Sequence, residues 1–190
     1  MTQPDDTTRA ERKLMASELF AMIKAVPLRS RIVEGGMMAV HAVGGATMAF
    51  LIGQALHTEQ AFWAAITAIA VSQHNYTDTQ NLSRDQFIGA MVGGVCGLAG
   101  ALLGGGHLLA YASTVAVAIV VCWCLNVASA ARLGGITATI MLLVPSMGSP
   151  LEIALTRLGE VTIGTTCALF VCWVIAKIET RWMAGREAKR

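Results

Sequence analysis

The stretch from residue 62 to residue 103 decides the fold, because a polar segment interrupts two apolar ones. It reads FWAAITAIAVS (62–72), then QHNYTDTQNLSRD (73–85), then QFIGAMVGGVCGLAGALL (86–103). A polar break bounded tightly by apolar runs has no favourable place in a soluble core, whereas in a bilayer it can line a water-filled cavity or the membrane face. The stretch therefore predicts the functional region of a membrane protein.

The composition of the whole chain points to the same class. Of its 190 residues, 55% are hydrophobic and only 14% are charged, with a mean hydropathy of +0.59, which indicates an integral membrane protein.

The five cysteines lie in apolar runs without nearby histidines at zinc-ligand spacing, so we interpret them as small buried side chains and expect no metal or cofactor. Basic residues flank the apolar runs without interleaved aromatic residues, which argues against nucleic-acid binding. No motif for nucleophilic catalysis, zinc hydrolysis or phosphate binding is present, so we do not expect an enzyme.

Six apolar segments follow one another, and the second and fifth are short. At about 12 or 13 residues these two fall below the roughly 17 to 25 needed to span a bilayer, whereas the other four reach that length. A short middle segment in each half predicts an all-helical fold of two inverted three-helix repeats, with a site between the broken middle helices. Ile66-Thr67-Ala68 recurs as Ile136-Thr137-Ala138, and the same spacing relates Gly94 to Gly164. The segments are 37–56, 61–73, 87–103, 109–126, 133–144 and 153–177.

The distribution of lysine and arginine predicts the orientation. Connections 57–60, 104–107 and 145–152 contain neither residue, whereas the opposite side collects nearly all of them, so both termini are expected in the cytoplasm. No signal peptide is expected. We predict a cytoplasmic segment over 1–34 with an interfacial helix at 19–26, a membrane domain over 35–178 and a basic tail over 179–190.

Small residues recur every four positions on two segments. Gly89, Gly93 and Gly97 form one such stripe, with Gly100 and Gly104 on a neighbouring one, and Gly45, Ala49 and Gly53 form another on the first segment. Such faces let helix backbones approach closely in lipid. The spacing leaves open whether they join helices within one chain or between chains. Because six segments of this size enclose little volume, we expect a homo-oligomer.

Arg157 and Glu160 are the charged residues set furthest into an apolar segment. They lie three residues apart on one helical face, with Gly164 one turn further on, so they can pair with each other. One interpretation is a self-neutralising structural pair. The other is that Arg157 attracts an anionic substrate while Glu160 exchanges a proton as the substrate passes.

The polar break supplies further candidates. Gln73, His74 and Asp78 offer donors, acceptors and an imidazole that titrates near neutral pH, although a solvated cytoplasmic loop is an equal alternative. Ser83 is expected to cap the third segment, with Asp85 in its first turn complementing the helix dipole. We interpret His41 as packed within the first segment, and Phe62-Trp63 as part of an interfacial aromatic belt.

The motifs around these residues resemble those of the fusaric acid resistance and aromatic acid exporter family. Its "YWA-x-x-T" segment is matched by Phe62-Trp63-Ala-Ala-Ile-Thr67, and its Pro followed by Arg-x-x-Asp/Glu-x-x-x-Gly is matched from Pro150 to Gly164. Its Arg-x-x-Gly-x-x-x-Gly helix reads Gln86 to Gly93 here, so arginine is replaced by Gln86, and Arg84 is the nearby residue that can substitute. The resemblance covers about 35–178 and implies one six-helix unit, where larger members are similar to two with cytoplasmic domains.

The resemblance implies proton-coupled export of aromatic carboxylic acids or related toxic organic anions by a multi-pass protein of the bacterial inner membrane. Expected partners are the organic-anion substrate, the lipid bilayer, further copies of the chain and possible envelope fusion proteins. A distant similarity to plant malate channels implies an organic-anion channel as the alternative, and a structural or assembly subunit without transport is a third. We expect Arg157→Gln to abolish export with folding intact. Substrate binding is expected of Arg157 and Arg132, which attract the carboxylate, and of Arg84, Thr67, Thr137 and Gln73, with the two threonines as donors at helix breaks. Proton coupling is expected of Glu160, His74 and Asp78.

Overall fold

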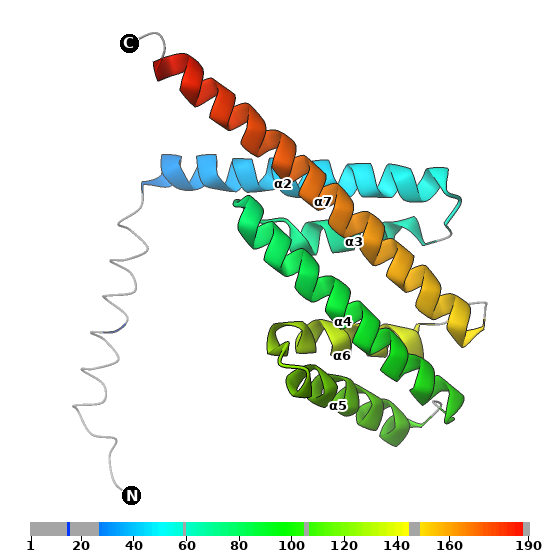
Figure 1. Ribbon diagram of the computed structural model, residues 1–190. Helices are drawn as coiled ribbons and strands as arrows, with labels where there is room; N and C mark the ends of the chain where they lie inside the picture. Colours follow the sequence, from blue (N-terminus) through cyan, green and yellow to red (C-terminus); the bar gives the residue numbers. More distant parts are fainter. Residues whose placement is uncertain (1–14, 16–26, 59, 105–106, 145–148, 188–190) are drawn as a thin grey trace, which may run out of the picture. The chain divides into compact units, whose positions relative to one another are not determined.

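The computed structural model describes residues 15, 27–58, 60–104, 107–144 and 149–187, and the expected interfacial helix at 19–26 lies outside them. The described part of the chain is all-helical and has no strand, as the sequence predicted. Figure 1 shows the helices along the chain. They are α2 (Leu28–Ala55), α3 (Ala61–Val71), α4 (Tyr76–Leu102), α5 (Leu108–Cys124), α6 (Ala128–Leu143) and α7 (Pro150–Glu187).

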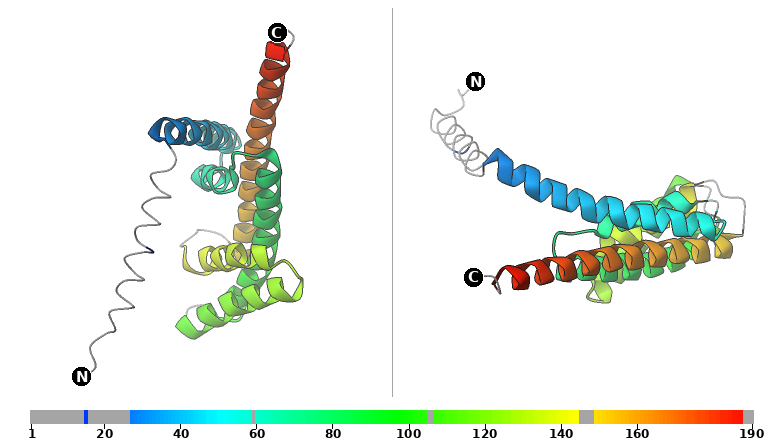
Figure 2. Two further views of the ribbon diagram at one scale, coloured as in Figure 1. Left: turned by 90° about the vertical axis from the view of Figure 1, so that its left-hand side faces the viewer. Right: turned by 90° about the horizontal axis from the view of Figure 1, so that it is seen from above.

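The chain divides into two compact units, Met1–Met37 and Met38–Arg190. The first includes the beginning of α2, and the second holds the rest of α2 and the other helices. Within the second unit, α4 and α7 lie side by side and run in opposite directions (Figures 1 and 2). Helix α3 packs against α7, and the α5–α6 hairpin packs against α4. The long helices therefore form the centre of this unit, with a short helix against each of them.

Among the described residues, three helices are long and apolar enough to cross a membrane, namely α2, α4 and α7, where the sequence predicted four. Helix α5 has 17 residues, at the lower limit of a span of about 17 to 25, and is not among these three, so a crossing by the fourth segment stays a prediction. Helix α3 is short as predicted, with 11 residues. Helix α6 has 16 residues and starts at Ala128 rather than 133, because the small residues preceding 133 continue the helix.

The start of α4 lies well before the predicted one. Asn75 is the N-cap, and its side chain accepts a hydrogen bond from the Thr77 N–H at 3.2 Å, with Asp78 in the first turn. Asparagine is among the best N-cap residues, and a carboxylate there complements the helix dipole. Ser83 is inside the helix, buried, with no partner for its hydroxyl among the described residues. The predicted capping roles of Ser83 and Asp85 were therefore wrong, and most of the polar break is helical.

Two alanine substitutions test whether Asn75 or Ser83 caps the start of α4. Asn75→Ala is expected to lower the stability by about 0.5 to 2 kcal/mol because it removes a cap. Ser83→Ala is expected to be neutral or stabilising, since it removes a buried hydroxyl with no described partner. Thermal unfolding of both variants in the same detergent, followed by circular dichroism, measures the difference. A larger loss for Ser83→Ala than for Asn75→Ala would contradict this helix start.

Helix α7 begins with a capping box and continues further than the predicted membrane segment. The Glu152 carboxylate accepts from the Ser149 N–H at 2.8 Å, and the Ser149 hydroxyl accepts from the Glu152 N–H at 3.3 Å. These reciprocal bonds satisfy two donors that a helix start leaves open. The helix then runs to Glu187, so most of the predicted basic tail continues α7.

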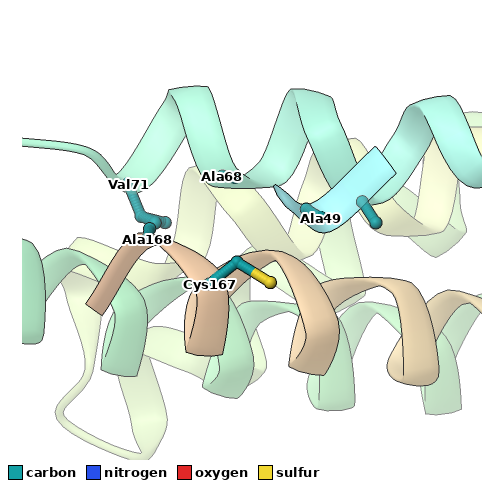
Figure 3. Close-up of a cluster of buried hydrophobic side chains, with 6 residues drawn as sticks. Ala49, Ala68, Val71, Cys167 and Ala168 are labelled. Atoms are coloured by element: carbon teal, nitrogen blue, oxygen red, sulfur yellow. The ribbon is translucent and has the colours of Figure 1, made fainter. Parts of the chain in front are cut away.

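Small side chains fill the contact of α2 and α3 with α7. Figure 3 shows Ala49 of α2, Ala68 and Val71 of α3, and Cys167 and Ala168 of α7 in one buried cluster, which also includes Ala64. A Cβ placed on Gly45 would lie 3.3 Å from the Ala168 Cα, so the helices approach closely there. The glycine stripe of α4 faces α6 in the same way. The stripes on α2 and α4 thus pack against helices of the same chain, whereas Gly104 lies beyond the end of α4 with nothing within 4 Å of an added Cβ.

The two halves of the chain share several local features. Helices α2 and α5 both end with a left-handed residue, His57 and Asn126, and each is followed by a pair of backbone hydrogen bonds typical of a Schellman motif. Gly164 of α7 lies against Thr67, and Gly93 of α4 lies against Thr137. Gly93 rather than Gly94 is therefore the geometric counterpart of Gly164, which corrects the spacing drawn from sequence. The inverted repeat itself stays a prediction.

The cysteines are free thiols with different exposures. Cys122, Cys167 and Cys172 are buried, as expected of small apolar side chains, and Cys96 is half-buried. Cys124 is exposed at the last turn of α5, so the interpretation was wrong for this residue. The apolar run around Cys124 gave no sign that its side chain would be exposed at the end of the helix.

Candidate functional site

A buried ion pair on α7 is the centre of the candidate site. The Arg157 Nη1 donates to the Glu160 Oε2 at 2.7 Å, and the side chains are 10% and 2% exposed respectively. Their separation of three residues places them on one helical face, as the sequence predicted. The second carboxylate oxygen of Glu160 is buried and has no hydrogen-bond partner among the described residues. One acceptor site of the pair is therefore left open inside the protein.

Trp63 of α3 covers the other side of the arginine. The Arg157 guanidinium carbon lies 4.0 Å from the centroid of the indole ring, which is a close cation–π contact. The Trp63 Nε1 donates to the Gln60 side-chain oxygen at 3.0 Å, which holds the ring in this orientation. Phe62 is exposed, as an interfacial residue would be, whereas Trp63 is half-buried against Arg157, so their membership of an aromatic belt stays a prediction. The site therefore combines a cation, a carboxylate and an aromatic face.

A close contact between backbones brings α3 and α7 together at this site. A Cβ on Gly164 would lie 2.5 Å from the Ala64 carbonyl oxygen and 2.8 Å from the Thr67 Cβ. Gly164 therefore allows α3 to approach α7 one turn from Glu160. Thr67 and Thr137 are buried in the middles of α3 and α6, so the expectation that they mark helix breaks was wrong. Both pack against a glycine of the facing helix instead.

The turn between α3 and α4 is held by its own hydrogen bonds. The Gln73 N–H donates to the Thr79 hydroxyl at 3.0 Å, and this hydroxyl donates to the Asn75 carbonyl at 3.1 Å. Cys172 of α7 lies against the turn, with its sulfur 3.6 Å from the Thr79 hydroxyl. These contacts fix the turn on α7 and leave the half-buried Gln73 beside it.

His74 and Asp78 are exposed at this turn, as a solvated position requires. The His74 ring lies 6.2 Å from the ring of His41, which is buried on α2 as predicted. Because Cys172 lies against the turn and is twelve residues from Glu160, the turn and the ion pair are about 18 Å apart along α7. Of the three residues expected to couple protons, His74 and Asp78 therefore lie at the turn, and Glu160 lies far from them in the ion pair.

The remaining cations are not part of the pair. Arg84 is exposed on α4, and Gln86, which occupies the position of the family arginine, is half-buried. Arg132 was expected in a connection, but it is exposed in the second turn of α6 and lines a groove against α5. Among the described residues, the ion pair of Arg157 with Glu160 is the only one formed. The structure thus groups Arg157, Glu160 and Trp63 and leaves Arg84 and Arg132 elsewhere.

Sequence reasoning identified the ion pair and missed its aromatic neighbour. The pair lies within one turn of one helix, so spacing alone predicted it. Trp63 is distant in sequence, and its apolar neighbours suggested a membrane interface. A usable signal was the four-residue spacing of Trp63 and Thr67, which puts both on one face of α3.

These helices, three of which are long and apolar enough to cross a membrane, define a helical membrane protein with a buried charged site. The chain belongs to the fusaric acid resistance protein-like family, which it matches over residues 48–171. That range includes Trp63, Arg157 and Glu160, and the family is one of membrane transport and resistance proteins rather than enzymes. Neither a curated protein nor a solved structure matches the chain.

Proposed function

We propose that this protein exports aromatic carboxylic acids or related organic anions across the bacterial inner membrane in a proton-coupled cycle. The observation that carries the proposal is the buried Arg157–Glu160 pair covered by Trp63. A guanidinium beside an indole face offers both recognition elements of an aromatic carboxylate, since arginine binds carboxylates through a fork of donors and aromatic rings stack on each other. Membership of a transport and resistance family supports the same class of function.

In this mechanism the substrate and Glu160 compete for one guanidinium. Protonation of Glu160 removes its negative charge and weakens its bond to Arg157, which frees the guanidinium for the substrate carboxylate. Deprotonation restores the ion pair and expels the anion. Proton binding and substrate binding are thereby coupled through a single side chain, without any further charged group at this level of α7. A proton and an anion cross the membrane together in this cycle, so export runs down the outward gradient of the acid.

Other predicted residues serve the path to the site. We assign Gln73, His74 and Asp78 to the cytoplasmic end, because the turn that holds them is about 18 Å from the pair and its histidine and aspartate are exposed. Thr67 shapes the α3–α7 contact and Thr137 the α4–α6 contact. The exposed Arg84 attracts anions from solution.

The distribution of basic residues predicts that both termini lie in the cytoplasm. The proposed functional form is a homo-oligomer, with an envelope fusion protein as a further partner.

The test is transport of a labelled aromatic carboxylate into liposomes that contain the purified protein. Uptake is measured at clamped voltage, with a pH gradient of either polarity and with none. Accumulation above equilibrium with one polarity only supports the coupled carrier. Equilibration that ignores the gradient favours the anion channel, and absence of flux for a panel of aromatic and aliphatic acids favours a structural subunit.

Two tryptophan variants test whether the aromatic face contributes to recognition. Trp63→Leu is expected to raise the KM for an aromatic acid about two- to tenfold, the range of one aromatic contact, and to change the KM for an aliphatic acid less. Trp173→Leu is the matched control, because Trp173 also contacts a cation, Lys177, but is exposed on α7. Equal effects of the two variants, or equal effects on aromatic and aliphatic acids, would contradict a role for Trp63 in recognition.

A further inference from the structure

A groove of about 570 Å³ lies between α5 and α6, away from the α3–α7 site. Its volume falls within the range of about 300 to 1,000 Å³ that is usual for small-molecule sites. One wall is a stripe of α5 with a spacing of four residues, and the other is a face of α6. The lining residues are Val115, Ile119, Trp123, Ala128, Ala131, Arg132, Gly135, Ile136, Thr139 and Ile140.

The groove is apolar except at one end. The Thr139 hydroxyl donates to the Gly135 carbonyl at 2.8 Å and lies 3.4 Å from the Tyr111 hydroxyl, so its one donor is used within the protein. Arg132 is the charged residue of the lining and lies near the short α5–α6 connection, as do Trp123 and Ala128. Among the described residues no acidic side chain forms an ion pair with Arg132. The groove therefore combines an aliphatic trough with one unneutralised cation at its end.

The shape of the groove follows from small residues on α6. Gly135 and Ala131 are buried, and a Cβ on Gly135 would meet the side chains of Val115 and Ile119 at 3.5 Å, an ordinary contact distance. Larger side chains at these positions would occupy the space between the helices. Trp123, at the same end as Arg132, is 66% exposed. Tryptophan and arginine are the residues that anchor at the boundary between lipid tails and headgroups.

From these features we propose that the groove binds an anionic phospholipid, with one acyl chain along the aliphatic trough and the phosphate on Arg132. The charges are complementary, since a guanidinium pairs with phosphate through two parallel hydrogen bonds. The protein is a membrane protein, so phospholipid is present wherever it works. Basic pockets between membrane helices on the cytoplasmic side are typical sites for anionic headgroups, and the basic residues predict that side for the α5–α6 connection.

This lipid site is separate from the proposed transport site. It uses α5 and α6, whereas Arg157, Glu160 and Trp63 lie on α3 and α7. The lipid is a bound constituent and is not exported. A measurement of lipid binding therefore stands or fails independently of any transport assay.

The experiment uses Trp123 as the reporter of an occupied groove. The full-length protein in detergent is titrated with phosphatidylglycerol or phosphatidylcholine, each carrying brominated acyl chains, and tryptophan fluorescence is recorded. Subtracting the signal of a Trp123→Phe variant isolates Trp123 from the other three tryptophans. We expect phosphatidylglycerol to quench Trp123 at about fivefold lower concentration than phosphatidylcholine.

Variants of the lining separate the headgroup from the chain. Arg132→Gln is expected to remove the preference for phosphatidylglycerol, and Arg132→Lys to keep most of it. Arg181→Gln is the matched control, because it removes an exposed arginine outside the groove. Ala128→Phe, at an exposed position of the lining, is expected to weaken quenching by both lipids because its ring fills the groove.

Four results would overturn the proposal. The first is equal quenching of Trp123 by the two lipids, and the second is equal loss of preference in Arg132→Gln and Arg181→Gln. The third is full displacement of the lipid by glycerol phosphate, which would show a headgroup site without a chain in the groove. The fourth is displacement by benzoate, which would make the groove a substrate site.

Discussion

Replacing Arg157 by glutamine, with Glu160 left in place, is expected to abolish export and to destabilise the protein by about 3 to 5 kcal/mol. The carboxylate of Glu160 is 2% exposed, and Arg157 supplies its one described hydrogen bond. Without the arginine, a buried charge has no counter-ion and must either be protonated or force the helix contact to rearrange. The burial of the ion pair therefore changes the prediction made from sequence, which was that Arg157→Gln abolishes export and leaves the fold intact.

A double variant separates the structural effect from the functional one. Arg157→Gln combined with Glu160→Gln removes both charges, so we expect it to recover most of the stability while export stays abolished. Stability is measured by thermal unfolding in detergent, and export by the liposome assay. Lys177→Gln is the control, because Lys177 is an exposed cation on the same helix, and its loss is expected to cost little.

Arg157→Lys tests whether the fork of the guanidinium matters beyond its charge. Lysine keeps the positive charge but lacks the planar pair of donors, so we expect a folded protein with much weaker export. Recovery of export in the double variant would remove the pair from the mechanism. Unchanged stability in Arg157→Gln would contradict the burial of the pair.

Gly164→Ala is expected to prevent close packing of α3 on α7 and to lower stability by about 1 to 3 kcal/mol or more. The added Cβ would lie 2.5 Å from the Ala64 carbonyl oxygen and 2.8 Å from the Thr67 Cβ. Because one of these atoms belongs to the backbone and the other to a branched side chain, neither can move aside cheaply. The helices must separate, which also shifts Trp63 away from Arg157 and is expected to reduce export.

The same helix offers a matched control for this substitution. A Cβ on Gly159 meets nothing within 4 Å, so Gly159→Ala is expected to be neutral or stabilising by up to about 1 kcal/mol through helix propensity. On α4, Gly93→Ala and Gly94→Ala form a second matched pair, since Gly93 lies against Gly134 and Thr137 and Gly94 faces open space. Thermal unfolding of all four variants checks the prediction. Similar losses of stability in Gly159→Ala and Gly164→Ala would show that helix propensity, rather than packing between helices, determines the effect of the substitution.

The ends of helices show where prediction from sequence failed. The polar residues 76–85 suggested a loop, yet they form the first turns of α4 because Asn75 caps the helix. Hydropathy measures whether a segment prefers lipid, and it does not measure whether a polar segment is helical. The same distinction explains why α6 begins at Ala128, before the predicted apolar segment that starts at residue 133. Arg132 consequently belongs to a helix and to the α5–α6 groove, rather than to a connection.

The sequence by itself determined the class of protein, the apolar helices, the close-packing glycines and the Arg157–Glu160 pair, because each depends on composition or on residues within two turns of one helix. Only the tertiary structure decided that Trp63 covers Arg157, that the polar turn lies about 18 Å from Glu160 along α7, and that α5 and α6 enclose a groove beside Arg132. These features depend on which helices pack together and in what register. That choice is made by the summed fit of many small side chains across helices far apart in sequence, and no local pattern records it.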